Sequence, residues 1–142
     1  GEIKQGNDTN GLLFFAAKNG DYGIELWKSD GTDSGTVMVK DLMAGVNYSS
    51  RPGDFVELNN TLYFTAYDLD NSRNLWQSDG TEEGTFMVKS FASDELESES
   101  IEVKNGIILL NVRKGGGEDA FDYQLWRSDG TETGTYFLGD IL

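Results

Sequence analysis

The chain has 142 residues, of which 37% are hydrophobic and 12% aromatic, enough apolar material for one packed domain and too much for a disordered chain. Its 11 Lys and Arg against 25 Asp and Glu give a net charge of −14, which argues against nucleic acid or an anionic membrane as a partner. No apolar run is long enough to predict membrane insertion. The lack of Cys and His excludes disulfides, zinc sites built on those residues, and Ser-His or Cys-His catalysis.

The first part of the chain contains four segments with the character of short strands. An alternating segment, Glu2–Lys4, comes first. The pair Asn10-Gly11, which tolerates the positive φ of a tight hairpin, precedes the apolar run Leu12–Ala17. A strand around Leu26-Trp27 follows, and the sequence Ser-Asp-Gly-Thr then leads into a fourth strand, Val37–Val39.

The same order of segments returns twice, which indicates three repeats of one unit. The motif Leu26–Thr36 recurs as Leu75–Thr85 and Leu125–Thr135, so that the three tryptophans lie at intervals of about 50 residues. We therefore expect a single repeat domain, 1–142, with units at about 1–48, 49–98 and 99–142. The later copies of the other segments are Phe55–Leu58, Asn59-Asn60, Leu62–Tyr67 and Phe86–Val88 in the second unit, and Ile101–Lys104, Asn105-Gly106, Ile107–Leu110 and Tyr136–Leu138 in the third.

Four short strands per unit predict an all-β fold of about twelve strands, since no segment has a sustained helical pattern. Units of 40–50 residues with four antiparallel strands are typical of propeller blades, and three such units also suit a β-trefoil. Apolar runs such as Leu12–Ala17 favour blades, whose central strands are buried on both faces. Because a propeller needs more than three blades, we expect a second copy to complete a six-bladed ring, or neighbouring repeats of a longer chain to do so.

The repeated Ser-Asp-Gly-Thr sequence predicts a turn that satisfies its own hydrogen bonds. The Asp side chain can accept backbone N–H bonds, threonine hydroxyls can bond the Asp carboxylate, and the glycine supplies a positive φ. We interpret the tryptophan as a plug between blades. The structural motif residues are Trp27, Asp30, Gly31, Trp76, Asp79, Gly80, Trp126, Asp129 and Gly130.

The run Glu25–Thr32, Glu-Leu-Trp-Lys-Ser-Asp-Gly-Thr, resembles the signature of the bacterial ELWxxDGT repeat family. The flanking segments Leu13–Ala17 and Val37–Leu42 resemble that family's repeat as well, so the resemblance covers the whole chain. It implies an extracellular or cell-surface β-repeat module and carries no catalytic residue. The first motif position departs from the signature at Asn74 and Gln124, which indicates that no charge is needed there.

Oxygen donors in the loop Asp68–Ser72 raise the hypothesis of a calcium site formed by Asp68, Asp70 and Asn71, because calcium prefers hard oxygen ligands. No other cofactor is indicated. A polar turn without metal accounts for the same residues, and this interpretation is favoured. The acidic run Asp94–Glu99 is interpreted as a solvated linker between the second and third units.

The function expected from these observations is a non-catalytic extracellular module for adhesion, recognition or structural assembly. Its expected partners are further copies of the chain, further repeats, a glycan or a surface protein. The alternative is a lectin-like domain in which Tyr22, Tyr67 and Tyr123, with Tyr48, stack on sugar faces. A fragment of a propeller hydrolase is less favoured, because it would need paired carboxylates across a cleft, one of them buried with a raised pKa.

Overall fold

The computed structural model describes residues 6–45, 48–91, 95–113 and 123–141, and these form twelve β-strands without a helix. The strands make three separate four-stranded antiparallel sheets, each following chain order from its first to its last strand. The first sheet contains β1 (Gly6–Thr9), β2 (Leu12–Asn19), β3 (Gly23–Ser29) and β4 (Val37–Lys40); the second contains β5 (Gly53–Leu58), β6 (Thr61–Tyr67), β7 (Arg73–Ser78) and β8 (Phe86–Lys89); the third contains β9 (Glu95–Lys104), β10 (Ile107–Arg113), β11 (Tyr123–Ser128) and β12 (Tyr136–Ile141).

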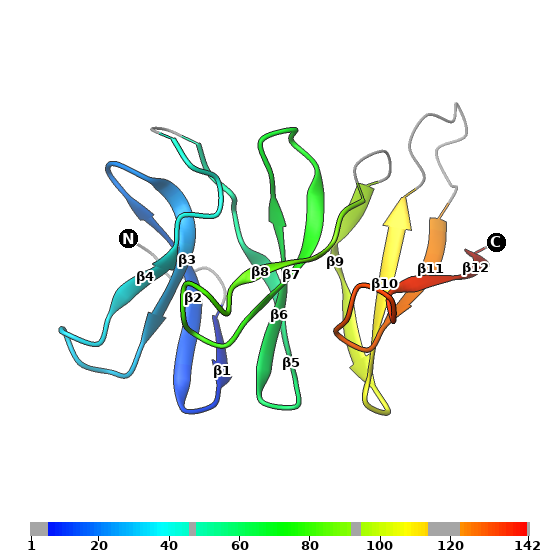
Figure 1. Ribbon diagram of the computed structural model, residues 1–142, viewed down its shortest axis with the longest axis horizontal. Helices are drawn as coiled ribbons and strands as arrows, with labels where there is room; N and C mark the ends of the chain where they lie inside the picture. The colour runs from blue at the N-terminus through cyan, green and yellow to red at the C-terminus, as the bar shows by residue number, and fades with distance from the viewer. Residues whose placement is uncertain (1–5, 46–47, 92–94, 114–122, 142) are drawn as a thin grey trace.

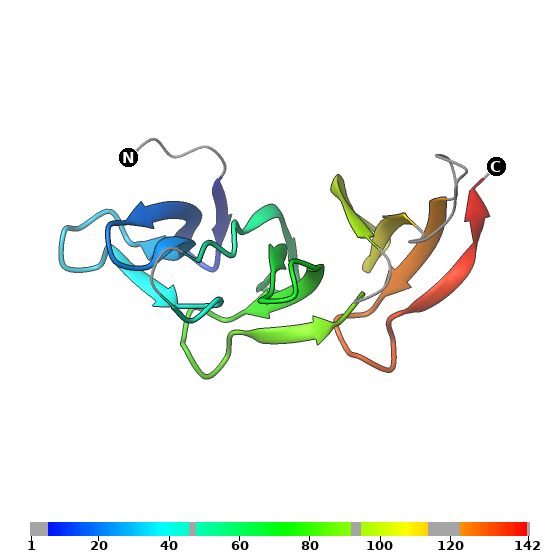
Figure 2. The same cartoon turned by 90° about the horizontal axis from the view of Figure 1, so that it is seen from above.

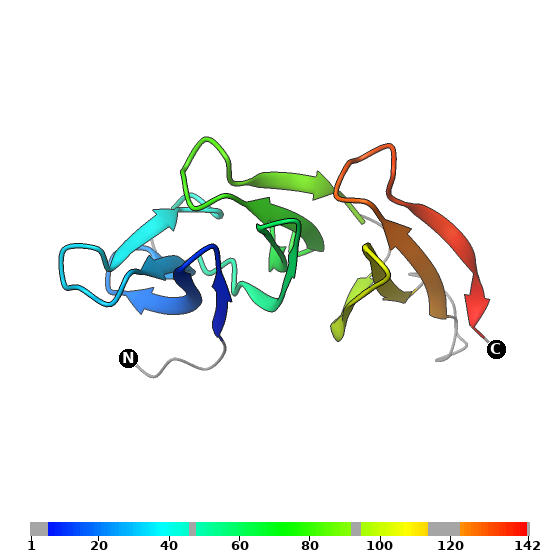
Figure 3. The same ribbon diagram turned by 90° about the horizontal axis from the view of Figure 1, so that it is seen from below.

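The three sheets stand side by side like the blades of a propeller, with the ends of the chain at opposite ends of the row (Figure 1). Seen from above, the first strands β1, β5 and β9 lie along one side of the row, and β4 and β8 lie along the other, while β12 (red) runs from that other side along the end of the row (Figure 2). The view from below shows the same arrangement from the opposite side (Figure 3). The all-β, propeller-like prediction is confirmed. The β-trefoil alternative is wrong, because the strands form three sheets rather than one closed barrel.

The hairpin turns adopt the backbone conformation that their sequences predict. Asn10-Gly11, Asn59-Asn60 and Asn105-Gly106 all have positive φ, between 52° and 76°. Two consecutive residues with positive φ match the twist of the flanking strands in a two-residue hairpin. These turns fix the register of the first two strands in each sheet.

Two strand assignments differ from the expectation. The first sheet begins with Gly6–Thr9, whereas Glu2–Lys4 lie outside the described residues. The interpretation of Asp94–Glu99 as a linker is wrong for Glu95–Glu99, which belong to β9; Asp94 lies outside the described residues. The backbone of this strand pairs with β10 despite its acidic composition, so the third unit begins before residue 99.

A β-bulge interrupts the pairing of the last two strands at the same place in every sheet. The register shifts between Leu26 and Trp27, and between the equivalent Leu-Trp pairs of the other two sheets. The extra residue on the last strand is Val39, Val88 or Leu138. A bulge bends the strand and increases its twist, and its presence at the same position in all three sheets makes it a regular feature of the repeat.

Successive side chains of a strand point to opposite sides, so each sheet has two apolar faces. We call the side carrying the motif leucine (Leu26, Leu75, Leu125) the Leu face, and the side carrying the motif tryptophan (Trp27, Trp76, Trp126) the Trp face. One core cluster joins the Leu face of the first sheet to the Trp face of the second. The other joins the Leu face of the second sheet to the Trp face of the third. At both internal boundaries, the Leu face of one sheet therefore packs against the Trp face of the next sheet along the chain.

Candidate functional site

The Ser-Asp-Gly-Thr turn closes on itself through side-chain hydrogen bonds. In the first copy, Asp30 Oδ1 accepts from Thr32 N at 2.9 Å and from Thr32 Oγ1 at 2.5 Å. The hydroxyl of Thr36 bonds Ser29 Oγ and the Thr32 carbonyl rather than the Asp carboxylate. The other two copies repeat these contacts. The hydroxyl and then the backbone N–H of the threonine hold the pKa of Asp30, Asp79 and Asp129 below the usual value.

Both glycines of this turn are required by geometry. Gly31, Gly80 and Gly130 have φ between 91° and 95°, as the sequence predicts. The second glycine, Gly35 in the first copy, has a different role that the sequence analysis did not identify. A Cβ there would lie 2.0 Å from Asp30 Oδ1, so only glycine allows the Asp carboxylate to fold over the turn.

The preceding sheet covers the turns of the second and third sheets. Phe14 lies against Gly80, and the Tyr63 hydroxyl lies against Gly130. Lys28 Nζ donates to Gly80 O, and Lys40 Nζ donates to Thr85 O. No described residue covers the turn of the first sheet in this way, because none lies within 4 Å of where a Cβ of Gly31 would be.

Equivalent positions show that, among the residues that the structure describes, no sheet packs on one face at each end of the row. On the Trp face, Leu13 is 37% exposed, whereas its equivalents Leu62 and Ile108 are fully buried. On the Leu face, Leu138 is 48% exposed, whereas Val39 and Val88 are 6% and 5% exposed. The uncovered faces are thus the Trp face of the first sheet and the Leu face of the third.

Two of the three motif tryptophans lie between blades, as the sequence predicts. Trp76 packs in the cluster between the first two sheets, and Trp126 packs on the cluster between the second and third. Trp126 also contacts Phe91 edge to face, with ring centroids 5.2 Å apart. Trp27 holds the same position on the uncovered Trp face of the first sheet.

In the first two sheets the first motif position anchors the segment that follows the last strand, whereas in the third sheet Gln124 Oε1 accepts from Trp126 Nε1 at 3.1 Å. Glu25 is fully buried; its carboxylate accepts from Leu42 N at 3.0 Å, from Ser50 N at 3.1 Å and from Ser50 Oγ at 2.6 Å. In the second sheet Asn74 Oδ1 accepts from Phe91 N at 2.8 Å, which is the bond equivalent to Leu42 N. An acceptor oxygen is therefore needed at this position, and a charge is not. Burial raises the pKa of Glu25 against the opposing effect of these hydrogen bonds.

An open pocket of about 430 Å³ lies beside this anchored segment. Tyr48, Arg51 and Tyr67 line it, together with Met43, Ser49 and Asn71. Tyr67 was predicted as a stacking residue, and the structure brings it together with Tyr48. Tyr22 and Tyr123 do not line this pocket: Tyr22 is in the turn between β2 and β3, and Tyr123 begins β11. The stacking roles of all four tyrosines stay predictions.

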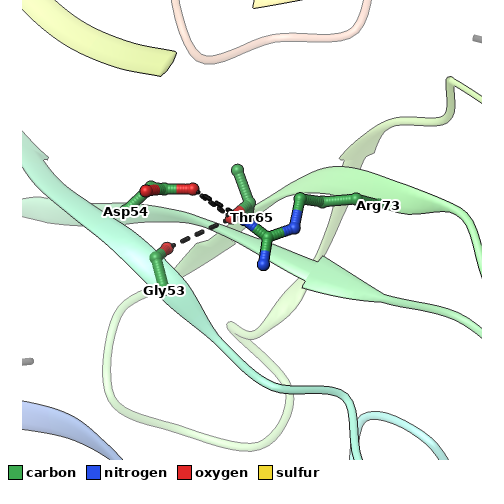
Figure 4. A network of polar contacts seen from close by, with 4 residues as sticks. All are labelled: Gly53, Asp54, Thr65 and Arg73. Atoms are coloured by element: carbon green, nitrogen blue, oxygen red, sulfur yellow. Dashed lines mark hydrogen bonds and ion pairs between the residues drawn. The ribbon is translucent and has the colours of Figure 1, made fainter. Parts of the chain in front are cut away.

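A polar network in the second sheet joins Gly53, Asp54, Thr65 and Arg73 (Figure 4). Asp54 Oδ2 accepts from Arg73 Nη1 at 3.0 Å and from Thr65 Oγ1 at 2.8 Å. The Thr65 hydroxyl also lies 3.4 Å from Gly53 O. The Arg73 guanidinium in turn lies over the Tyr67 ring, 4.9 Å from its centroid. The Asp54–Arg73 pair is thereby in contact with Tyr67, one of the residues that line the pocket.

The candidate calcium residues form a closed polar turn. Asp68 Oδ1 accepts from the backbone N–H groups of Asp70 and Ser72, and Asp68 Oδ2 accepts from Asn74 Nδ2 at 2.6 Å. In the described part of the chain, no three or more acidic side chains gather in a way that could hold a metal ion. The calcium hypothesis stays a prediction.

Comparisons with known proteins give a likeness of fold. No family model and no curated protein matches the chain. Among solved structures, an alpha-L-arabinofuranosidase from Clostridium thermocellum ATCC 27405 is similar over 96% of this chain and 50% of its own, with a TM-score of 0.49 and 18% identity. The chain thus spans half the length of that structure. Within the described residues, there is no helix of the length and apolar character that a membrane crossing requires.

Proposed function

We propose that this chain is a non-catalytic extracellular repeat module for recognition and structural assembly, whose end faces are covered by further blades of the same type. The observation that carries the proposal is the exposure of Leu13 and Leu138 at positions that are buried at both internal boundaries. Apolar surface of this kind on a repeat end is an interface or an aggregation hazard. The two internal boundaries indicate which surface covers each exposed end face: a Trp face covers a Leu face, and a Leu face covers a Trp face.

A second copy of the chain offers the matching surface. If the Leu face of the third sheet packs on the Trp face of another copy's first sheet, Leu138 is buried as Val39 and Val88 are. Arg127, at the position of Lys28, then lies where it can donate to the carbonyl of Gly31 in the other copy, as Lys28 does to Gly80. Two such contacts between two copies give six blades, a number within the range that closes a propeller.

The non-catalytic part of the proposal is supported by the bonding of Glu25. This side chain has the burial and the raised pKa expected of a catalytic acid. Its two oxygens, however, bond the backbone and hydroxyl of the segment after β4, and Glu25 does not line the pocket. A structural anchor accounts for all of these contacts.

Molar mass in solution tests the assembly. We expect light scattering after size exclusion to give the mass of more than one copy for the unmodified protein. Leu138→Glu and Gly31→Ala, at opposite ends of the row, should each reduce the mass to one copy while keeping the circular dichroism spectrum. Leu69→Glu, on an exposed loop, is the control and should keep the assembled mass. A single copy at every concentration contradicts the proposal.

Carbohydrate binding is a second candidate function, favoured by the pocket that contains Tyr48 and Tyr67. Aromatic rings beside polar donors are suited to the apolar faces and hydroxyls of sugars. The residues that line this pocket come from the segment between β4 and β5 and from the end of β6 and the loop after it, so one copy of the chain supplies all of them.

A further inference from the structure

We propose that the pocket binds a neutral saccharide unit, and that the strained backbone of Arg51 serves to hold its guanidinium at that site. The inference rests on the second function above, carbohydrate binding, and not on assembly. It is carried by Arg51 itself, by the bonds that hold Arg51 in place, and by the polar and aromatic side chains around it.

Arg51 has an unusual backbone conformation for its residue type. Its φ is 48°, and the other non-glycine residues with positive φ in the described chain are all Asn or Asp, which tolerate this region. The next residue is Pro52, and a residue before proline prefers an extended conformation. A strained backbone conformation persists only where the surrounding contacts impose it, and such residues are found most often at functional sites.

Buried hydrogen bonds on both sides impose the conformation of Arg51. Its backbone N–H donates to Ile24 O at 3.2 Å. The preceding residue, Ser50, is fully buried, bonds Glu25 through its N–H and hydroxyl, and accepts from Tyr67 N at 2.7 Å. These contacts need the backbone of the segment but do not need an arginine side chain, so a glycine at position 51 would satisfy them with less strain.

The side chain of Arg51 is free to bind a ligand. Arg51 is exposed and lines the pocket, and its guanidinium makes no ion pair or hydrogen bond with any residue of the described chain. A planar guanidinium with five donors suits a pair of neighbouring hydroxyl groups. The fold therefore maintains a strained arginine whose side chain has no structural partner.

The surrounding side chains indicate the class of ligand. Tyr48 is 53% exposed, and its ring lies against Gly45, where a Cβ would come within 2.5 Å of Cδ2. The Arg73 guanidinium lies over the Tyr67 ring. Two positioned rings, with the hydroxyl of Ser49 and the amide of Asn71 beside them, suit the mixed apolar and hydroxyl surface of a sugar. The net charge of −14 disfavours an acidic sugar, so a neutral one fits best.

The test separates the fold from the binding site by comparing Arg51→Gly with the unmodified chain. The probes are xylohexaose, cellohexaose and maltohexaose at millimolar concentration, with trigalacturonic acid as the charged counterpart. Binding is measured from the changes in amide chemical shifts. We expect Arg51→Gly to melt at the same or a higher temperature and to bind the neutral probe at least about tenfold more weakly. Tyr48→Ala should weaken binding similarly, and Tyr22→Ala, at an exposed tyrosine outside the pocket, should not.

Three results overturn the inference. If Arg51→Gly lowers the melting temperature, the arginine has a structural role. If it binds the neutral probe as well as the unmodified protein does, the inference about Arg51 fails while carbohydrate binding stands. If no neutral probe shifts the resonances of the pocket residues, the saccharide site is wrong, and carbohydrate binding through this pocket fails with it.

Discussion

Lys28 Nζ donates a hydrogen bond of 2.6 Å to the carbonyl oxygen of Gly80, from the Leu face of the first sheet to the turn of the second. Lys40 makes a similar bond to Thr85 O at 2.9 Å. Both lysines lie on the face that meets the next sheet, so each ties its own sheet to its neighbour's turn. Apolar packing between sheets is thus accompanied by charged donors that fix how the sheets are aligned.

Removing the Lys28 ammonium should weaken this boundary. Lys28→Met keeps most of the stem and loses the bond, and we expect the free energy of unfolding to fall by about 1.5–3 kcal/mol, the usual range for a hydrogen bond to a charged group. Urea unfolding measures this change. Lys104→Met removes an exposed lysine from a strand end and is the control, with an expected change below about 0.5 kcal/mol. Equal losses in both variants would show that the bond contributes nothing specific.

The three turn glycines should respond differently to alanine. All three variants place a Cβ at positive φ, which costs about 1–2 kcal/mol. Gly130→Ala also directs the Cβ to within 2.2 Å of Tyr63 Oη, so we expect a larger loss than for Gly31→Ala, whose Cβ enters open space. Thermal unfolding in dilute solution measures the difference. Adding Tyr63→Phe, which removes the hydroxyl, should recover part of the loss for Gly130→Ala only.

The buried carboxyl of Glu25 predicts a specific dependence of stability on pH. Because burial raises the pKa of this carboxyl in the folded protein above its usual value of 4.5, the folded chain holds the proton more tightly than the unfolded chain does. The contribution to stability is therefore largest below the unfolded pKa and is lost as pH rises through the folded pKa. We expect the deficit of Glu25→Gln in free energy of unfolding to be larger near pH 4 than near pH 7.

Asp79 is the control, because its effect on stability should depend on pH in the opposite direction to that of Glu25. Its pKa is lowered, chiefly by the Thr81 hydroxyl, so its contribution is present above the unfolded pKa and is lost as pH falls. The deficit of Asp79→Asn should accordingly shrink toward acid pH, where that of Glu25→Gln grows. Parallel profiles for the two variants would contradict the assignment of Glu25 as a buried acid.

The loop Asp68–Ser72 should be stable without metal. Asp68→Ala removes three accepted hydrogen bonds, so we expect a lower melting temperature by the same amount in millimolar calcium and in chelator. Asp70→Ala, whose backbone N–H contributes to the turn, should change little in either condition. A melting temperature of the unmodified chain that rises with calcium, and no longer does so in Asp70→Ala, would instead establish the calcium site.

Local sequence patterns were sufficient to predict the architecture. Asn10-Gly11 and its counterparts identify the hairpins because few residues accept two successive positive φ values. The apolar run Leu62–Tyr67 identifies a strand buried on both sides, and the structure buries nearly all of β6. The repetition of the motif gives the number of sheets directly. Each of these features is determined by residues that are close in the sequence, so this single sequence is enough to predict them.

Features that depend on distant residues were not predictable in the same way. The acidic composition of Glu95–Glu99 suggests solvent, yet its backbone pairs with β10 and so belongs to a strand. The strain at Arg51 arises from the contacts of Ser50 and Glu25 and has no signal in the sequence beyond the following proline. The pocket likewise brings Tyr48, in the segment between β4 and β5, close to Tyr67 at the end of β6, and this proximity depends on how that segment packs on the second sheet.

The self-contained turn around Asp30, Asp79 and Asp129 has a consequence for how such chains evolve. Every hydrogen bond that closes the turn lies within one copy of the motif, and every boundary between sheets joins the same two faces. A duplicated copy inserted between two others would meet on each side the surface it already fits. Lineages can therefore gain or lose units in steps of about 50 residues without redesigning any neighbour.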